Sequence, residues 1–346
     1  MPEIASGQSS AAIDRAVALL KAGQLIGLPT ETVYGLAADA DNPDAVAKVF
    51  AAKGRPADHP LIVHIGADDL LSHYARDIPD VAWALAEAFW PGPLTLILKK
   101  ASGVPDVVTG GQDTVGIRVP GHPVALTLLR AFAQSRQNAG QQGGGLAAPS
   151  ANRFGRISPT AARDVADELG DAVPLILDGG DCQVGIESTI VDLSRGEPVV
   201  LRPGAVTAEQ LALVLGEPVS GVLAESKGVP RVSGSLASHY APVTPLEVME
   251  AATIESLLES ADTNFAAIVR DCSAVSAPMR QCPQVIVLAD EPTAFAHDIY
   301  RALRDLDARG YTKILVQTLP TTVEWAAVQD RLGRAAHQEL PDNDLG

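Results

Sequence analysis

Residues 28–36 of this 346-residue chain read Leu-Pro-Thr-Glu-Thr-Val-Tyr-Gly-Leu. The apolar run Leu25–Leu28 at the start of this stretch is typical of a buried strand. Two threonines, a glutamate and a tyrosine then follow within five positions, more polar groups than a packed core needs. Ligand sites of open α/β sheets lie at the carboxyl ends of strands. The stretch therefore suggests a ligand site, although by itself it fits a polar turn with satisfied hydroxyls equally well.

The composition is that of a globular chain with a strong negative charge. Hydrophobic residues make up 47% of the sequence and charged residues 20%, so cores for about two domains are expected. The net charge of −16 argues against broad affinity for a nucleic-acid backbone, which requires clustered Lys and Arg. Cys182, Cys272 and Cys282 lack the spacing of zinc ligands or of a disulfide framework. Because neither a signal-peptide pattern nor a long apolar run is present, we expect a cytoplasmic protein without a membrane span.

Helical and strand patterns alternate through the first two thirds of the chain. Apolar periodicity predicts helices near 11–21, 43–53, 79–89, 122–132 and 159–169, and strands near 25–28, 60–65, 94–98, 114–119, 146–148, 174–177, 186–191 and 199–201. Hairpin-like spacings occur beside helical crossovers. We therefore predict an α/β domain with a twisted mixed sheet and flanking helices, not a purely doubly wound one.

A segment rich in Gly, Ser and Pro, residues 217–245, separates this domain, predicted at 8–216, from a smaller one at 246–346. At about thirty residues without a helical or strand period, the segment is either a disordered linker or a functional lid. Beyond it, we predict a small Rossmann-like α/β domain with strands at 265–269, 285–288 and 314–316 and helices at 293–307 and 322–334. The Gly- and Gln-rich segment Ala139–Gly145 predicts a mobile surface loop.

Two groups of cations suit an anionic ligand. Lys53 and Arg55 lie close together at a predicted helix end, where they indicate a nearby anion unless they only complement the helix dipole. Thr114 and Arg118 share one face of a predicted strand, and Gly116 between them leaves room for a ligand. The second pattern is the stronger indication of a site.

Other polar side chains remain open between a structural and a ligand-binding role. They are His64 within a strand, Ser150 and Asn152 at a strand end, Ser188 and Thr189 inside the predicted strand 186–191, Arg202 at a strand end, and His239 with Tyr240 in the linker. No Ser-His-Asp order, metal-ligand spacing, GxxxxGK[ST] loop or GxGxxG motif occurs. These donors and cations favour a site that binds anions and acts by positioning and charge stabilisation, as adenylation requires.

Seven motifs in order resemble the YrdC-type domain. They are residues 28–36, Lys53–Pro56, His59–Leu61, Trp90–Pro93, Gly116–Pro120, Pro149–Asn152 and Ser188–Asp192. The paired KxR and SxN signatures of that domain correspond to Lys53 with Arg55 and to Ser150 with Asn152. The linker sequence His239–Pro242 and the small second domain resemble the long form of the threonylcarbamoyl-AMP synthase family.

This resemblance implies an enzyme that joins L-threonine, bicarbonate or CO₂, and ATP into threonylcarbamoyl-adenylate and pyrophosphate. A separate tRNA threonylcarbamoyl transferase would consume the adenylate to modify tRNA. By motif, threonine would be held by Thr32, His64, Arg118, the backbone of Ala148, and Ser188. ATP would be held by Arg55, His59, Thr114, Ser150, Asn152, Ser158, Arg202 and Tyr240.

The resemblance also implies how the reaction is assisted. Lys53, Arg55 and Arg202 are the expected catalytic residues, because charge builds on phosphate oxygens during attack on the α-phosphorus. Mg²⁺ is expected as the cofactor, bound mainly through the phosphates of ATP. No general base is assigned, and the linker is expected to close over the adenylate. Two features depart from the family pattern, the Ala139–Gly145 insertion and His59 in place of a frequent Asn.

Two other functions were compared with this one. A YrdC-type module that binds double-stranded RNA or tRNA is the alternative, although the charge of −16 leads us to expect weak or indirect tRNA binding. A carbamoyl-transfer domain of hydrogenase maturation would carry zinc-finger and acylphosphatase-like segments and cysteine pairs, which this sequence lacks.

Overall fold

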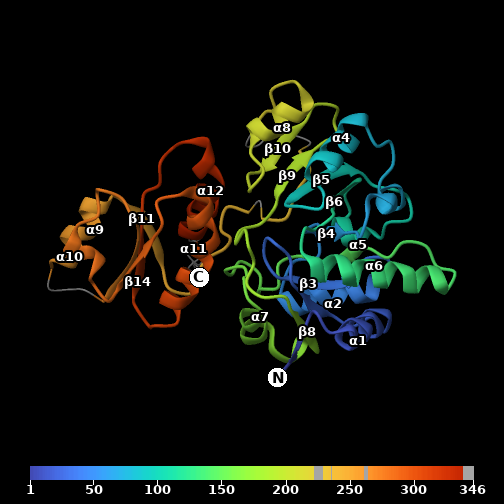
Figure 1. Cartoon of the computed structure of the whole chain (residues 1–346), viewed down its shortest axis with the longest axis horizontal. Helices are drawn as coiled ribbons and strands as arrows, with labels where there is room; N and C mark the ends of the chain where they lie inside the picture. Colours follow the sequence, from blue (N-terminus) through green and yellow to red (C-terminus); the bar gives the residue numbers. More distant parts are fainter. Residues whose placement is uncertain (222–228, 235, 261–263, 338–346) are drawn as a thin grey trace, which may run out of the picture. The chain divides into compact units, whose positions relative to one another are not determined.

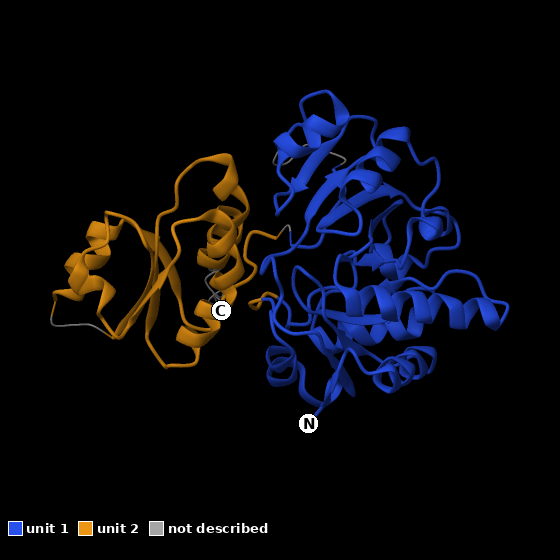
Figure 2. Ribbon diagram, in the orientation of Figure 1, with its two compact units in different colours: residues 1–154, 158–235 blue, residues 155–157, 236–346 orange. Residues whose placement is uncertain are grey.

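The computed structural model describes residues 1–221, 229–234, 236–260 and 264–337. The chain divides into two compact units (Figure 2). Unit 1 comprises Met1–Phe154 and Ser158–Ser235, and unit 2 comprises Gly155–Ile157 and Leu236–Gly346. The predicted linker, 217–245, therefore contributes to both units, and its residues 222–228 and 235 lie outside the described part.

A mixed sheet forms the centre of unit 1 (Figure 1). It has ten strands, in the order β1-β8-β2-β3-β7-β4-β6-β5-β9-β10. Its strands are β1 (Glu3–Ser6), β2 (Ile26–Leu28), β3 (Gly35–Asp39), β4 (Ile62–His64), β5 (Leu94–Lys99), β6 (Thr114–Arg118), β7 (Leu146–Ala147), β8 (Leu175–Asp178), β9 (Thr189–Asp192) and β10 (Val199–Arg202). Its helices are α1 (Ser10–Lys21), α2 (Pro43–Lys53), α3 (Leu71–Tyr74), α4 (Asp80–Phe89), α5 (Asp106–Thr109), α6 (Pro123–Asn138), α7 (Ala162–Leu169) and α8 (Ala208–Leu215). The predicted α/β fold with a mixed sheet and flanking helices is confirmed.

Capping groups set the helix boundaries that position the site. In α2, the Asn42 side chain accepts hydrogen bonds from the backbone at the helix start, and Pro43 occupies the first turn. The helix ends at Gly54, whose φ of 62° lies in the left-handed region that favours glycine. The signature cations Lys53 and Arg55 therefore lie on either side of a helix C-cap.

Several elements of unit 1 differ from the prediction, including β1, α3 and α5, which were not predicted. Strand β9 begins at Thr189 and not at Ile186, because its partner β5 begins at Leu94, the residue paired with Thr189. Ser188 consequently precedes the strand. Strand β3 was not predicted, because its sequence Gly-Leu-Ala-Ala-Asp has little intrinsic strand preference; its pairing with β2 and β7 holds it in the sheet. Helix α8 was not predicted either.

Alternate residues of the strands enter two different cores. On one face, Val63, Ile117, Leu96, Val191 and Val200 are paired in sequence across β4, β6, β5, β9 and β10 and join a core that includes residues of α2, α4, α7 and α8. The opposite face of β2, β3 and β8 packs against α1 and α6 (Figure 1). The helices α1 and α6 therefore cover only one half of the sheet. They do not cover the same face of β4, β6, β5, β9 and β10.

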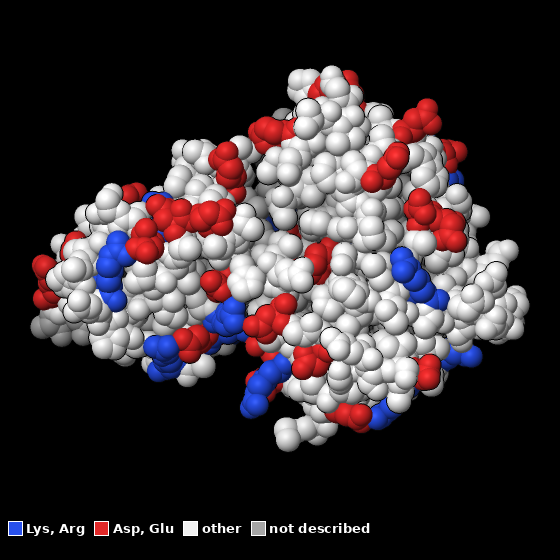
Figure 3. Space-filling view, in the orientation of Figure 1, with Lys and Arg blue, Asp and Glu red and all other residues white. Residues whose placement is uncertain are grey.

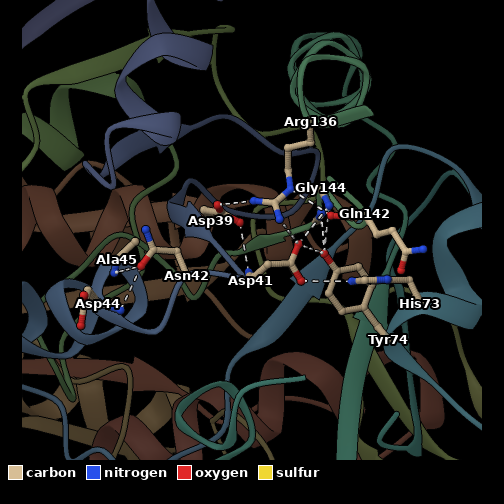
Figure 4. Close-up of polar contacts among 11 residues, drawn as sticks. Asp39, Asp41, Asn42, Asp44, Ala45, His73, Tyr74, Arg136, Gln142 and Gly144 are labelled. Carbon is tan, nitrogen blue, oxygen red and sulfur yellow. Dashed lines mark hydrogen bonds and ion pairs between the residues drawn. The ribbon is translucent and has the colours of Figure 1, made fainter. Parts of the chain in front are cut away.

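The Gly- and Gln-rich segment Ala139–Gly145 ends in an anchored turn. The backbone N–H of Gly144 donates to Asp41 Oδ2 (3.1 Å) and to the Tyr74 hydroxyl (3.2 Å), and Arg136 donates to the Gln142 carbonyl (Figure 4). Gly144 and Gly145 are buried, so the prediction of a surface loop is wrong for these two residues. It holds for residues 139–142, which are exposed.

Unit 2 is a second α/β unit with a four-stranded parallel sheet in the order β11-β14-β12-β13. Its elements are β11 (Leu246–Met249), α9 (Ala251–Leu258), β12 (Phe265–Arg270), α10 (Ala277–Arg280), β13 (Val285–Leu288), α11 (Pro292–Asp307), β14 (Lys313–Gln317) and α12 (Ala326–Ala336). The predicted strands and long helices are confirmed, whereas β11, α9 and α10 were not predicted. Asp307 accepts hydrogen bonds from the backbone N–H groups of Val243 and Thr244, so the end of the predicted linker packs within this unit.

Candidate active site

One face of the sheet in unit 1 carries polar side chains on adjacent strands. Paired residues of neighbouring strands lie on the same face of a sheet. His64 of β4 is paired with Arg118 of β6, while Thr95 of β5 and Arg202 of β10 are both paired with Ile190 of β9. Alternation along β5 and β6 places Thr95 one step from the Leu96–Ile117 pair, and therefore opposite Arg118. His64, Arg118 and Thr95 therefore lie on adjacent strands of the face that α1 and α6 cover elsewhere, and the apolar Ile190 of β9 separates them from Arg202.

Arg118 is held by three residues that come from two parts of the chain. Its Nε donates to the Gly92 carbonyl (3.1 Å), and its Nη1 donates to Thr32 Oγ1 (2.9 Å). Its Nη2 lies 2.6 Å from Glu31 Oε1, an ion pair in which both side chains are less than 10% exposed. Two motifs, residues 28–36 and Trp90–Pro93, therefore fix the guanidinium in one orientation.

Thr30 explains the local geometry of the loop that supplies Glu31 and Thr32. Its hydroxyl donates to the Val33 carbonyl (2.6 Å) and accepts from the backbone N–H groups of Thr32 and Val33. These hydrogen bonds form the polar turn with satisfied hydroxyls that was one of the two interpretations of residues 28–36. They involve only Thr30, Thr32 and Val33. The turn holds Thr32 and Glu31 against Arg118, and the ligand-site interpretation of the stretch stays a prediction.

His64 is a neutral imidazole beside this cation. Burial, and then the charge of Arg118, lower the pKa of His64 to about 3. Its Nδ1 has no hydrogen-bond partner among the described residues. A buried neutral imidazole with an unused ring nitrogen can donate to or accept from a ligand hydroxyl.

A second polar group lies where β5, β9 and β10 meet. The Ser188 and Thr95 hydroxyls are 2.8 Å apart, and Arg202 donates from Nε and Nη2 to the Ser188 carbonyl and from Nη2 to Ser188 Oγ (3.2 Å). Arg202 Nη1 donates to the carbonyl of Ser233, in the first part of the predicted linker. Arg202 therefore orders both Ser188 and the segment that follows residue 228.

Lys53 joins α2 to the Ser150–Asn152 turn. Its ammonium donates to the carbonyls of Ser150 and Asn152, and its side chain is almost fully buried. Burial, and then the charge of Arg55, lower the pKa of Lys53 well below its usual range. The two family signatures thus touch each other, since the KxR lysine binds the backbone of the SxN turn.

Arg55 and His59 share a contact with Phe154. The Arg55 guanidinium lies 5.9 Å from the centre of the Phe154 ring, and the His59 ring meets it edge-on at 5.3 Å. Arg55 also donates to the Pro60 carbonyl (3.0 Å). Burial and the Arg55 charge lower the pKa of His59. Phe154 is a contact that sequence reasoning missed, because a single aromatic residue in a turn carries no signal.

The other predicted site residues of unit 1 contact segments that lie next to the groups described above. Ser158 Oγ donates to the carboxylate of Glu187, next to Ser188, and Ser150 forms a bridge with Gly35 at the end of the 28–36 stretch. The Ala148 N–H donates to the Ile62 carbonyl (3.1 Å), beside His64. Thr114 lines a small hollow together with residues 60–62, Gln112, Gly116 and residues 231–233.

Tyr240 belongs to unit 2, so its predicted contact with ATP stays a prediction. Its ring is buried there, stacks on Tyr300 with ring centres 6.0 Å apart, and lies under the guanidinium of Arg331 at 5.3 Å. Its φ of 61° is rare for a residue other than glycine. Packing within unit 2 holds this backbone conformation.

Two kinds of feature are absent from the residues that the structure describes. Among them, no three His, Cys, Asp or Glu side chains are grouped so that they could hold a metal ion. No helix in the described part of the chain is long and apolar enough to cross a membrane.

Known proteins share both the sequence and the architecture of this chain. Residues 18–204 match the Sua5_yciO_yrdC family model, described as telomere recombination, and residues 206–337 match the model of the threonylcarbamoyl-AMP synthase C-terminal domain. Threonylcarbamoyl-AMP synthase of Pyrococcus abyssi is 37% identical over 93% of both chains. The enzyme of the same name from Bacillus subtilis is 38% identical over 94% of this chain and 92% of its own length.

Two solved structures of P. abyssi Sua5 match the fold. One is a variant with a histidine and a tyrosine replaced by alanine, with a TM-score of 0.85 at 34% identity over 97% of this chain and 96% of that one. The other, a complex with L-threonine, has a TM-score of 0.82 at 36% identity over 94% of both chains. The resemblance found in the motifs is confirmed over nearly the whole length. The chain belongs to the threonylcarbamoyl-AMP synthase family of nucleotidyltransferases, in the form that combines a Sua5/YciO/YrdC domain with the family's C-terminal domain.

Proposed function

We propose that this chain condenses L-threonine, bicarbonate or CO₂, and ATP into threonylcarbamoyl-adenylate and pyrophosphate, the first step of a tRNA modification. The observation that carries the proposal is the guanidinium of Arg118, held from three sides next to the neutral His64 on the polar face of the sheet. A rigid, buried cation is suited to the carboxylate of an amino acid, and a neutral imidazole to a hydroxyl. Thr32, Ala148 and Ser188 complete the proposed threonine site.

ATP is assigned to the neighbouring residues Arg55, His59, Thr114, Ser150, Asn152, Ser158, Arg202 and Tyr240. After threonine has formed a carbamate, a carbamate oxygen attacks the α-phosphorus and pyrophosphate leaves. Lys53, Arg55 and Arg202 stabilise the charge on the phosphate oxygens. Positioning by the fixed side chains supplies much of the remaining acceleration.

Mg²⁺ is proposed as the cofactor, held mainly by the phosphates of ATP. The oxygen-rich triphosphate is a ligand set that Mg²⁺ prefers, and it commonly needs few protein ligands there. The first part of the predicted linker contributes to the proposed lid, since Ser233 binds Arg202. A lid of this kind would protect the adenylate from hydrolysis. The adenylate would pass to a separate tRNA threonylcarbamoyl transferase, and we propose a cytoplasmic location.

Pyrophosphate release tests the proposal. The purified chain would be given ATP and Mg²⁺, with L-threonine and bicarbonate each omitted in turn, and the adenylate would be identified by mass spectrometry. Release that needs both substrates and yields the threonylcarbamoyl-adenylate mass supports the enzyme. Release that needs neither, or no release under any combination, contradicts it and favours a module that binds double-stranded RNA or tRNA.

The surface charge gives no support to that alternative. Acidic side chains are interspersed with Lys and Arg over the described part of the face seen in Figure 3. The net charge of −16 opposes association with a phosphate backbone. A steep fall of tRNA affinity with rising salt would be the evidence in its favour.

A further inference from the structure

Glu31 is a buried carboxylate whose capacity to accept hydrogen bonds is not used. Its side chain is 8% exposed, and Arg118 Nη2 lies 2.6 Å from its Oε1. Despite that ion pair, neither Oε1 nor Oε2 accepts a hydrogen bond of normal geometry from the residues that the structure describes. A carboxylate offers about four lone-pair directions, and buried polar atoms are nearly always satisfied. The deficit indicates a group that arrives with the substrate.

The groups that face Glu31 cannot fill this role. Arg118 faces Oε1 through Nη2, but this contact is an ion pair without hydrogen-bond geometry, and it leaves Oε2 without a donor among the described residues. The charge of Glu31 acts on His122, whose pKa burial nevertheless lowers, and on Cys182, whose pKa is raised first by burial and then by Glu31. Neither is a hydrogen-bond donor to Glu31.

Gly121 bounds the same carboxylate. A Cβ added there would lie 3.4 Å from both Cδ and Oε1 of Glu31. Glycine therefore keeps the space next to this oxygen clear by about the width of one methyl group. That space suits a small donor such as an ammonium group.

None of the residues assigned above to the threonine site carries a negative charge, and Glu31 would supply one. An α-amino acid carries its carboxylate and its ammonium on the same carbon atom. Arg118 suits the carboxylate, while His64, Thr32 and Ser188 are neutral and suit the hydroxyl or the backbone atoms. Because Glu31 and Arg118 are 2.6 Å apart, they present adjacent opposite charges that match those of the amino acid.

We propose that Glu31 receives the α-ammonium group of the amino-acid substrate and removes one proton from it before the carbamate forms. This inference rests on the proposed function. The carboxylate takes one proton from the nitrogen, which leaves a neutral amine and a protonated Glu31. The amine lone pair then forms the N–C bond to CO₂, one C–O π bond opens to an oxyanion, and the second nitrogen proton goes to solvent. The product is the carbamate needed for attack on the α-phosphorus.

A purely structural role for Glu31 makes a different prediction. If Glu31 only oriented Arg118, its loss would weaken every carboxylate ligand equally, whether or not that ligand carried an ammonium. The decisive comparison is therefore between L-threonine and 2,3-dihydroxybutanoate of the same configuration, in which a hydroxyl replaces the ammonium.

The experiment measures binding of both ligands by calorimetry to the full chain and to Glu31→Gln, which keeps the size of the side chain. The wild-type chain should prefer threonine by at least about 10-fold, and Glu31→Gln should reduce that preference to within about 2-fold. Asp41→Asn, which neutralises a partly buried carboxylate near an arginine, is the matched control and should keep the preference. Glu31→Asp is the second variant if Glu31→Gln does not fold, and it should show an intermediate preference.

The pH dependence of turnover tests proton removal. In Glu31→Gln, turnover should rise by up to about 10-fold per pH unit above pH 7, because only threonine that is already neutral in solution can react. The wild-type chain should depend less steeply on pH. Equal slopes would overturn the role in proton removal.

The outcomes separate this inference from the proposed function. If the wild-type chain binds threonine but Glu31→Gln keeps the preference, or loses both ligands equally, the inference is overturned while the proposed function stands. If the wild-type chain neither binds threonine nor releases pyrophosphate with it, the proposed function fails and the inference fails with it.

Discussion

Two pairs of arginine and carboxylate in unit 1, one buried and one partly buried, have opposite hydrogen-bonding states. In the first, Glu31 pairs with Arg118 but accepts no hydrogen bond from the described residues. In the second, Asp41 lies 3.6 Å from Arg136 and also contacts the Tyr74 hydroxyl (3.0 Å), the Gly144 N–H (3.1 Å) and the His73 ring (3.2 Å) (Figure 4).

The comparison teaches how to separate a site from a structural network. Both pairs join a guanidinium to a carboxylate of low exposure, so the presence of such a pair does not by itself identify a ligand site. The property that distinguishes them is the number of hydrogen bonds that the carboxylate oxygens accept. A complete network such as that of Asp41 stabilises the turn at Gly144, whereas an incomplete one such as that of Glu31 has capacity for a ligand.

The largest expected effect comes from Arg118→Ala. Threonine-dependent turnover should fall by at least about 10³-fold, because the cation for the substrate carboxylate is lost. The unfolding free energy should also fall by about 3–5 kcal/mol, because Glu31 becomes a buried charge without a partner. Pyrophosphate release and urea unfolding measure the two effects.

A double variant keeps that prediction testable. Adding Glu31→Gln to Arg118→Ala should recover much of the stability but none of the turnover. Turnover that returns together with stability would mean that Arg118 acts only in folding, and the contrast between the two pairs would disappear.

The second expected effect concerns the Asp41 network. Asp41→Ala should lower the unfolding free energy by about 2–3 kcal/mol, because Tyr74 and Gly144 lose a buried acceptor. Threonine-dependent kcat and KM should stay within about 2-fold of wild type, measured below the unfolding temperature of the variant. A selective rise of KM for threonine would place this network in the site and break the comparison.

A pH effect of similar or smaller size distinguishes His64. Its folded pKa of about 3 lies below the value of about 6.5 expected for an unfolded chain. The unfolded chain therefore binds a proton first as the pH falls, so the stability contribution is complete above pH 6.5 and is lost between pH 6.5 and 3. The loss is about 1.4 kcal/mol per pH unit in this window.

His64→Gln removes this titration. Urea unfolding at pH 7.5 and pH 5.5 should show a smaller loss of stability in the variant than in the wild-type chain. The other histidines, including His59 and His122, remain in both proteins and cancel in the difference. Equal losses would show that His64 is not buried in its neutral form.

The sequence predicted on which strand face one candidate site residue lies, because strand alternation is a local property of the chain. Alternation along Thr114–Arg118 was enough to place Arg118 on one face of a strand with Gly116, and the structure places His64 beside it. Glu31 lies in residues 28–36, the most informative stretch of the chain, but it is not among the site residues that the sequence predicts. Its importance depends on unused acceptors, which no sequence pattern reveals.

The sequence by itself determined the fold class, the family and the helix boundaries at Asn42 and Gly54, because periodicity and capping are local properties of neighbouring residues. The tertiary structure alone decided that Ser188 precedes its strand, that Gly35–Asp39 is a strand, and that Glu31 meets Arg118. These features depend on pairing and burial between segments far apart in the chain. Strand pairing can override weak local propensity, and only the folded environment fixes which polar groups remain unsatisfied.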